Sequence, residues 1–448
     1  MLSAATIKQR ALDVGFDLAG IAPPTALEDL EFLPQWIKKG YGGEMRYLQN
    51  PRRQDPRLVL PSVKSVICVG LIYNTPYPYS SEVARLSSSE VELPSRRDVT
   101  TDAPPRGWIS RYAWGKDYHK VMRKKLEQLR AVLEQLAEGV ETRVYVDTGP
   151  IMERAFARIS GIGWMGRNTC IINEQKGSWF FLGVILTSLE LAADIPAPDR
   201  CGSCTRCLEA CPTGALTEPY VMNASRCIAY LNIELRGTIP EELRTAVGNN
   251  VFGCDICQDV CPWNGRPLSG AGSRLSVVGN RSSVVNGRSS DSDSRDDHSY
   301  CDTAQRRAAT TLAEFQPMQV EMKSVGPLAE STDEDAAAQH VPSAQHAPTK
   351  PFSLFNPTLE ELASMTEADF ERAFAHSPIK RAKYRGWLRN LCVVMGNSGD
   401  RRFIPWLESL AAKPNRAESP DPIVAEHAVW ALRKLQGEGG GSAPNRSD

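Results

Sequence analysis

The apolar positions of residues 1–197 alternate between strand spacing and helical spacing. Residues 65–73, SVICVGLIY, form an unbroken apolar and β-branched run, which predicts a buried strand. Residues 117–139 repeat their apolar positions at helical spacing, which predicts a long amphipathic helix that ends at Gly139. This alternation predicts an α/β domain over residues 1–197.

Further elements are predicted in the second half of this domain. Residues 143–146, RVYV, predict a short strand, and the helix that follows is expected to open with Pro150 at its first position and Gly149 as its N-cap. Residues 169–173 and 178–187 are apolar runs separated by EQKG, which predicts a β-hairpin.

Two segments lack this periodicity. Residues 80–106 are polar and contain prolines, so we expect a surface insertion there. Residues 268–350 are rich in serine, glycine and charged residues, so we expect a low-complexity, disordered insertion. Between the α/β domain and the second insertion lies a separate cysteine-rich region, residues 198–267.

Helical spacing returns in residues 351–437, where four amphipathic helices are predicted. Trp387 and Trp430 recur at an interval that suits paired-helix repeats. The pattern predicts a C-terminal α-helical domain of HEAT-like repeats, followed by a disordered tail over residues 438–448.

The composition limits the classes of function. The formal net charge of the 448-residue chain is −1, so binding of nucleic acid or anionic lipid has to come from a local patch. The N-terminus has no secretory pattern, and the longest apolar stretch, residues 179–186, is too short to span a bilayer. We expect a soluble, cytoplasmic protein that does not bind membranes.

The cysteines carry the most specific signal. Eight of the twelve lie between residues 201 and 261, which in a chain without a secretory signal indicates metal binding rather than disulfides. Four of them follow the spacing C-x2-C-x2-C-x3-C-P, in which three thiolates hold one [4Fe–4S] cluster and the fourth holds a second cluster. Residues 253–264, GCDICQDVCPWN, add three more cysteines, and Cys227 completes the set of eight.

We therefore predict a ferredoxin-like domain with two clusters over residues 198–267. The ligands expected for one cluster are Cys201, Cys204, Cys207 and Cys261, and those for the other are Cys211, Cys227, Cys254 and Cys257. A zinc site is the alternative, but it would leave both Cys-Pro elements and Cys227 unexplained. Two neighbouring clusters form an electron relay, whose direction the sequence does not fix.

A glycine motif, G-x-G-x-x-G, occurs at Gly161, Gly163 and Gly166. A dinucleotide fingerprint follows a strand and opens a helix. This motif instead follows a predicted helix and precedes the predicted hairpin. We expect its glycines to form a tight turn whose backbone approaches a large ligand closely.

Candidate catalytic groups are few in this half of the chain. Asp147 ends the predicted strand 143–146 beside a glycine turn, so it is a candidate for proton transfer, and an ordinary turn aspartate is the alternative. His119 stands near the start of the long predicted helix, where a lone histidine is more often structural or exposed than catalytic. Four aromatic residues fit either a core or the wall of a flat ligand pocket: Trp108, Tyr112, Trp114 and Tyr118.

Together these segments resemble the epoxyqueuosine reductase family. The resemblance covers residues 1–267 outside the 80–106 insertion and resumes from about residue 351. The segments that carry it are DPRLVLPSVKSVICVGLIY, ISRYAWGKDYHKVM, YVDTGPIMERAFARISGIGWMGRNT, CGSCTRCLEACPTGAL, RCIAYLNIE and GCDICQDVCPWN.

The resemblance implies reduction of the epoxide of epoxyqueuosine, at the wobble position of tRNA, to give queuosine. It implies a cobalamin bound between the α/β domain and two [4Fe–4S] clusters, and a flavodoxin- or ferredoxin-like electron donor. It makes Asp147 the proton donor for the leaving oxygen. The cobalamin contacts that it implies are Arg57, Tyr112, Asp147, Gly163, Trp164, Gly166, Asn168 and Ser225.

A tRNA substrate requires a basic surface. The C-terminal helical region places five cations within ten residues: Lys380, Arg381, Lys383, Arg385 and Arg389. Such a face can hold a phosphate backbone while the anticodon base enters the reaction site. A solvated, charged helix is the alternative.

Two other classes of function compete with this one. A corrinoid reductive dehalogenase has a related cofactor layout, but such enzymes usually carry a twin-arginine export signal, which is absent here. A non-enzymatic electron carrier with two clusters would need neither Asp147 nor a corrinoid. We expect an oxidoreductase that acts as a monomer.

Overall fold

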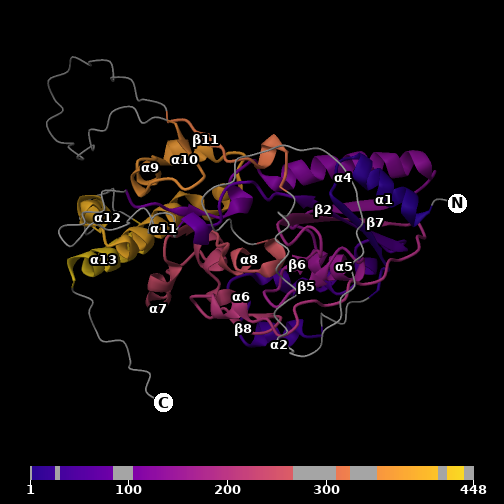
Figure 1. Cartoon of the computed structure of the whole chain (residues 1–448), viewed down its shortest axis with the longest axis horizontal. Coiled ribbons are helices and arrows are strands. Elements are labelled where there is room, and N and C mark those ends of the chain that lie inside the picture. The colour runs from indigo at the N-terminus through magenta and orange to yellow at the C-terminus, as the bar shows by residue number, and fades with distance from the viewer. Residues whose placement is uncertain are drawn as a thin grey trace, which may run out of the picture.

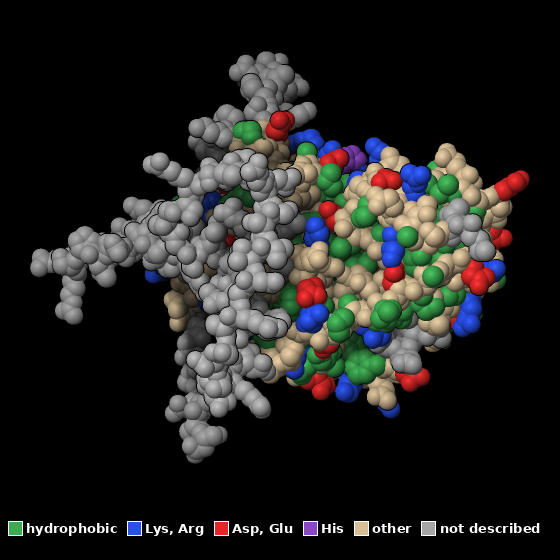
Figure 2. Space-filling view, turned by 45° about the vertical axis from the view of Figure 1, so that its right-hand side comes forward, with side chains coloured by type: hydrophobic (Ala, Val, Ile, Leu, Met, Phe, Trp, Pro, Cys, Tyr) green, Lys and Arg blue, Asp and Glu red, His purple; other side chains and the backbone are tan. Residues whose placement is uncertain are grey.

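The computed structural model describes residues 3–25, 31–83, 104–265, 309–322, 351–411 and 421–437. Most of the two expected insertions and the expected tail lie outside these residues. Among the described helices, none is both long enough and apolar enough to cross a membrane. On the face seen in Figure 2, acidic and basic side chains are interspersed, as the small net charge suggests.

A four-stranded sheet organises the N-terminal domain. Its order is β1 (Leu18–Ala22), β2 (Ser65–Ile72), β7 (Phe180–Thr187) and β4 (Thr142–Tyr145). Every neighbouring pair is antiparallel, so helices and strands form layers as expected but without parallel β-α-β units. Each residue of β2 is buried, which confirms the strand predicted from its unbroken apolar run.

Helices cover both faces of this sheet (Figure 1). Alternate residues of a strand point to opposite faces. One face of β2 packs with α1 (Ala4–Asp13) and α4 (Tyr118–Leu136) in a single hydrophobic cluster. The other face packs with α5 (Glu153–Ile159). The apolar runs therefore predict both the buried strands and the helical layers above and below them.

The predicted hairpin of residues 169–173 with 178–187 is wrong. The strand β6 (Ile171–Ile172) pairs with β5 (Trp164–Met165), and only a single bridge joins Asn173 to Gly177. The long strand β7 pairs with β2 and β4 instead. An eight-residue strand that is apolar on both faces requires long buried neighbours, and a two-residue strand does not supply them.

The predicted start of helix α5 is also wrong. The helix begins at Glu153, its N-cap position is Met152, and Pro150 and Gly149 precede it. Asp147 takes a left-handed backbone conformation, with φ of 56°, which turns the chain sharply out of β4. Gly149 is needed for packing, because a Cβ there would lie 2.2 Å from the side chain of Tyr145.

The cysteine-rich region consists of short elements. They are α6 (Arg206–Glu209), β8 (Leu216–Glu218), β9 (Val221–Met222), a π-helical turn (Tyr230–Glu234), α7 (Glu241–Arg244), β10 (Asn250–Phe252) and α8 (Ile256–Asp259). Strand β10 runs parallel to β3 (Trp108–Ile109), which ties this region to the N-terminal domain.

Residues 351–411 and 421–437, the described part of the C-terminal region, contain five α-helices. They are α9 (Leu359–Ala363), α10 (Glu367–Ala373), α11 (Lys383–Ser398), α12 (Ile404–Ala411) and α13 (Pro422–Gln436). The first predicted helix is in fact two, because Thr358 and Thr366 each begin a helix with a capping box. Trp387 and Trp430 are both buried in one core that also contains apolar residues of the cysteine-rich region. These helices lie at the end of the molecule opposite the sheet (Figure 1).

One part of the second expected insertion is ordered. Within residues 309–322, Phe315 is buried and its ring lies 5.2 Å from that of Phe181. Strand β11 (Gln319–Val320) pairs with β12 (Phe352–Ser353). Disorder was therefore the wrong prediction for this segment, whose apolar residues are spaced closely enough to pack against both domains.

Candidate functional site

The structure gathers the eight predicted cluster ligands into two neighbourhoods. Burial raises the pKa of Cys207 to about 11, and charges on Cys204 and Cys201 add to this shift. Burial also raises the pKa of Cys261 to about 12, with contributions from Cys201, Cys170 and Cys207. Apart from Cys170, these neighbours belong to one predicted ligand set.

The second neighbourhood contains four partly buried cysteines. Burial raises the pKa of Cys254 well above its usual value, with additional contributions from Cys227 and Cys211. The pKa of Cys257 is raised first by a hydrogen bond with Cys170 and then by burial, with Cys254 and Cys227 nearby. Cys170 is a partly buried thiol beside a predicted ligand, and it is not among the predicted ligands itself.

Polar hydrogens point at these sulfurs. Backbone N–H groups donate to them, among others from Leu208 to Cys207 and from Ile256 to Cys254. The indole Nε1 of Trp164 lies 3.4 Å from Cys201 Sγ. Such donors favour the thiolate, which is the form that binds metal.

The arrangement fits clusters better than single ions. All of the described cysteines are free of disulfides. A structural zinc ion needs four ligands in contact with one centre, whereas the thiolates around a [4Fe–4S] cluster bind separate irons.

Buried polar contacts fix the second cysteine loop against the N-terminal domain. Asp255, which lies between two of the cysteines, accepts hydrogen bonds from Trp108 Nε1 at 3.0 Å and from the backbone N–H of Arg111 at 2.8 Å. Ser178 donates its backbone N–H to Asn264 Oδ1 at 2.7 Å. The cysteines are thus held at fixed positions relative to the sheet.

The glycine motif supports this cysteine region. A Cβ at Gly163 would lie 2.2 Å from the carbonyl oxygen of Ile172, so the close approach is to the neighbouring strand rather than to a ligand. Trp164 packs against Trp263 and Cys201, and Asn168 Nδ2 donates to the carbonyl of Cys257 at 3.1 Å. The structure therefore places this motif beside the cysteine loops.

Asp147 lies at the centre of a second polar group. Tyr118 donates its hydroxyl to Asp147 Oδ2 at 2.9 Å, and His119 Nε2 lies 3.3 Å from the same oxygen. The other ring nitrogen of His119 lies 2.7 Å from Asp117 Oδ1. Asp117 is also the N-cap of α4, so the start of this helix fixes the imidazole between two carboxylates.

The charges in this group oppose one another. Burial alone would raise the pKa of Asp147, but hydrogen bonds from His119 and Tyr118 outweigh it and lower the pKa to about 2. Burial alone would lower the pKa of His119, but Asp117 and Asp147 raise it to about 9. At neutral pH the carboxylate is therefore ionised and the imidazole carries the proton.

Further residues from distant segments surround Asp147. Burial raises the pKa of Tyr112, and the charges of Asp147 and Arg381 also act on it. Burial raises the pKa of Glu153 to about 7, with Asp147 nearby. The Tyr112 hydroxyl and Glu153 Oε1 have no hydrogen-bond partner within the described parts of the chain. Unpartnered polar groups around a half-exposed carboxylate fit a site that holds a further polar cofactor.

Sequence reasoning missed part of this group and included residues that lie elsewhere. It missed Glu153 and Tyr47, whose pKa is raised by burial and by the charges of Glu234 and Asp147. Arg57 instead pairs with Asp55 at 2.6 Å, and Ser225 donates to Asn223 Oδ1 at 2.6 Å. Neither residue contacts the Asp147 group among the described interactions.

Comparisons with known proteins bear on both groups. The family described as 4Fe-4S double cluster binding domain matches residues 200–264, and the one described as "Epoxyqueuosine reductase QueG, DUF1730" matches residues 53–148. An epoxyqueuosine reductase of Gloeobacter violaceus is 38% identical over 401 residues, which cover 89% of this chain and 97% of that protein. The chain belongs to the epoxyqueuosine reductase family.

Solved structures of this family share the fold. One is a crystal structure of epoxyqueuosine reductase with an epoxyqueuosine-modified tRNA-Tyr stem loop, at 26% identity and a TM-score of 0.68, covering 96% of this chain and 89% of that one. Another, from Bacillus subtilis, is described with an aspartate catalytic loop swung out of the active site. It is 26% identical with a TM-score of 0.67 and covers 96% of this chain and 90% of that one.

Proposed function

We propose that this protein reduces epoxyqueuosine in tRNA to queuosine. Loss of the epoxide oxygen as water, leaving a carbon–carbon double bond, consumes two electrons and two protons. One observation carries the proposal. The chain shares its fold with a tRNA-bound family member, and this fold brings together two cysteine neighbourhoods and a separate proton-bearing group at Asp147.

The eight cysteines supply the electron relay. The first cluster is held by Cys201, Cys204, Cys207 and Cys261, and the second by Cys211, Cys227, Cys254 and Cys257. Each set contains partly exposed cysteines, so burial does not decide at which cluster electrons enter. A flavodoxin- or ferredoxin-like protein is the donor that we propose.

The site between the sheet and the cysteine region would hold cobalamin, which would supply the reducing electron pair. Asp147, Tyr112 and Glu153 are the residues that we propose to face it, because their polar atoms are half-exposed or unpartnered. Gly163, Trp164, Gly166 and Asn168 act behind this site by fixing the cysteine loops. Arg57 and Ser225 would reach the cofactor only from the periphery.

The protein's own contribution to the chemistry is the proton. An aspartate with a pKa of about 2 is a poor donor at neutral pH, whereas its partner His119, with a pKa of about 9, holds a proton. We propose that this proton passes from His119 Nε2 to Asp147 Oδ2 and on to the leaving oxygen. Tyr118 steadies the carboxylate in the orientation that both transfers require.

The C-terminal helices hold the tRNA. Helices α11, α12 and α13, which pack on one another around Trp387 and Trp430, are the HEAT-like unit in this proposal. Arg381 acts on the pKa of Asp147, so this part of the chain reaches the reaction site. A single copy of the chain contains every group named, so we propose a monomer.

The test uses protein purified without oxygen and tRNA that carries epoxyqueuosine. Nucleosides from the treated tRNA are separated and identified by mass. We expect queuosine to replace epoxyqueuosine when a low-potential reductant is present, and the absorbance of the protein to show a corrinoid band as well as the broad iron–sulfur band. Unchanged epoxyqueuosine with both cofactors bound would contradict the proposed reaction.

A further inference from the structure

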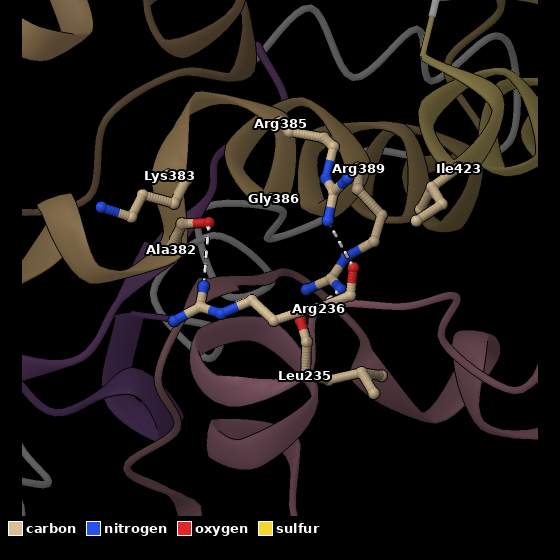
Figure 3. Close-up of a pocket in the computed structure, with 8 residues that line it drawn as sticks. All are labelled: Leu235, Arg236, Ala382, Lys383, Arg385, Gly386, Arg389 and Ile423. Atoms are coloured by element: carbon tan, nitrogen blue, oxygen red, sulfur yellow. Dashed lines mark hydrogen bonds between the residues drawn. The ribbon is translucent and has the colours of Figure 1, made fainter. Parts of the chain in front are cut away.

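A basic pocket lies where the cysteine region meets the C-terminal helices. It has a volume of about 230 Å³ and lies between the segment at Leu235 and Arg236 and the first turns of α11 (Figure 3). Its other lining residues are Ala382, Lys383, Arg385, Gly386, Arg389 and Ile423. Four of the eight lining residues are cations and none is acidic.

One of the four cations, Arg389, has a structural role, and the other three line the pocket with donors that are still free. Arg389 is buried, and its guanidinium donates to the carbonyls of Leu231 at 2.7 Å and of Leu235 and Gly237 at 2.8 Å. Its remaining donors meet Asn390 Oδ1. This side chain therefore has no N–H left for a ligand and acts by holding the pocket in shape.

The charge of Arg389 is not balanced by an acid. Burial and the charges of Arg236 and Arg385 lower its pKa to about 10, and the charge of Glu44 only partly opposes them. Glu44 accepts from the backbone N–H of Arg236 at 3.1 Å, and Asp421, which caps α13, lies 3.5 Å from Arg385. Cations that repel one another around an open space, with little acid beside them, attract an anion.

Three side chains retain free donors. Arg236 uses one nitrogen to donate to the carbonyl of Arg381 at 2.8 Å, and Arg385 uses one to donate to the carbonyl of Arg236 at 2.9 Å. The side chain of Lys383 has neither a hydrogen-bond nor an ion-pair partner in the parts of the chain that the structure describes. Its φ of 63° is a strained conformation for a residue with a side chain, and such strain concentrates at functional positions.

The neighbouring cations are already engaged. Lys380 pairs with Glu371 at 2.8 Å, and Arg381 pairs with Glu234 at 2.5 Å. Of the five cations that the sequence placed on a basic face, Lys383 has no partner among the described residues, and Arg385 has only the longer ion pair with Asp421 at 3.5 Å, so these two can still bind an anion in this pocket. Arg236, from a different domain, completes the site.

We propose that this pocket binds one backbone phosphate of the tRNA substrate, through Arg236, Lys383 and Arg385. The inference rests on the proposed function. A phosphodiester fits the chemistry because its two free oxygens accept from several donors at once. A polynucleotide fits the location because the C-terminal part also meets the start of α4: Asp117 donates its backbone N–H to the carbonyl of His376 at 2.7 Å. Arg381, two residues before Lys383, acts on the pKa of Asp147, so one strand can reach both places.

The test measures binding of an anticodon stem loop to the cofactor-loaded protein over a range of salt concentrations. We expect the double variant Arg236→Gln/Lys383→Gln to weaken binding by about tenfold at low salt. The slope of log Kd against log salt should fall by about 0.7–0.9, because the variant no longer neutralises that one phosphate. The control is Lys64→Gln, an exposed lysine before β2 at the end of the sheet away from Asp147, which should change neither quantity.

A second measurement identifies the phosphate. Stem loops with one neutral methylphosphonate at successive positions should reveal a single position where the wild type loses affinity and the double variant does not. A wild-type salt slope in the double variant, or an equal loss at that position in both proteins, would overturn the proposal. So would a loss of inorganic phosphate binding without any change toward RNA.

Two features keep the outcome interpretable. Lys383→Gln alone removes no side-chain interaction within the described structure, so it serves if the Arg236 change impairs folding. Failure of the proposed function would instead be seen as wild-type protein that leaves epoxyqueuosine in tRNA unreduced, which does not depend on the pocket variants.

Discussion

Asp147 and His119 form a pair in which the proton lies on the imidazole. The left-handed turn at Asp147 brings its carboxylate to the first turn of α4, where Tyr118 and His119 meet it. Asp117 acts on the other side of the ring. At the scale of single residues, the proposed chemistry depends on this row of two carboxylates and one imidazole.

The change Asp147→Asn tests the end of this row. Asparagine tolerates the left-handed backbone and keeps the size of the side chain, so the fold and both cofactors should remain. It cannot pass on a proton, and we expect the single-turnover rate of epoxyqueuosine reduction to fall at least tenfold, within the ~10²–10⁴ range for general acids. A wild-type rate in the variant would remove Asp147 from the mechanism.

The pH dependence tests the other end. His119 has a pKa raised to about 9, so it stays protonated below that value and loses its proton as the pH rises through it. We expect the single-turnover rate to decline above about pH 9. In Asp117→Asn the helix cap is retained but one of the two negative charges is removed, so the decline should move to lower pH.

The matched control for this experiment is Asp13→Asn. Asp13 is an exposed acid at the end of α1 that pairs with Arg10 at 3.3 Å, away from the Asp147 group. The pH at which its rate declines should equal that of the wild type. A profile that is the same for Asp117→Asn and for the wild type would show that His119 does not carry the proton.

At the scale of elements, the sequence predicted what local pattern determines. The buried run of β2 and the periodicity of α4 are properties of neighbouring residues, and both elements were confirmed. The pairing of β7 with β2 and β4 is a contact between distant segments, which spacing alone does not reveal. The start of α5 was missed because the turn at Asp147 displaces the helix beyond its proline.

The small pair β5–β6 gives a prediction at this scale. In Gly163→Ala the added Cβ would meet the carbonyl of Ile172 at 2.2 Å, so β5 must shift relative to β6, which disturbs the 3.4 Å contact between Trp164 and Cys201. We expect a decrease of about 1–3 kcal/mol in the free energy of unfolding and a lower iron content after reconstitution. Thermal melting and iron analysis measure both.

Gly237→Ala is the control for that change. Its Cβ would meet only Glu44, at 3.8 Å, so stability and iron content should stay near the wild-type values. Equal iron content in the two alanine variants would show that the glycine motif does not support the cysteine loops.

At the scale of the whole molecule, the parts that the sequence separates share one core. Cys227 and Cys254 pack against the same cluster of apolar side chains as Trp387 and Trp430. The spacing of the cysteines predicted the metal-binding residues because that motif is local. It did not predict that Tyr47, Glu153 and Arg381 would surround Asp147, because three distant segments have to meet before they do.

This shared core leads to a prediction about metal removal. Without the clusters, the thiols lose the groups that link them. The resulting loss of stability should extend to α11 and α13 through the common core. We expect chelated protein to melt on the order of 10 °C lower. Tryptophan fluorescence, which includes Trp387 and Trp430, should change together with helical circular dichroism in one transition. Lys64→Gln protein treated alike should match the wild type. A C-terminal transition unmoved by iron removal would mean that these helices fold independently of the clusters.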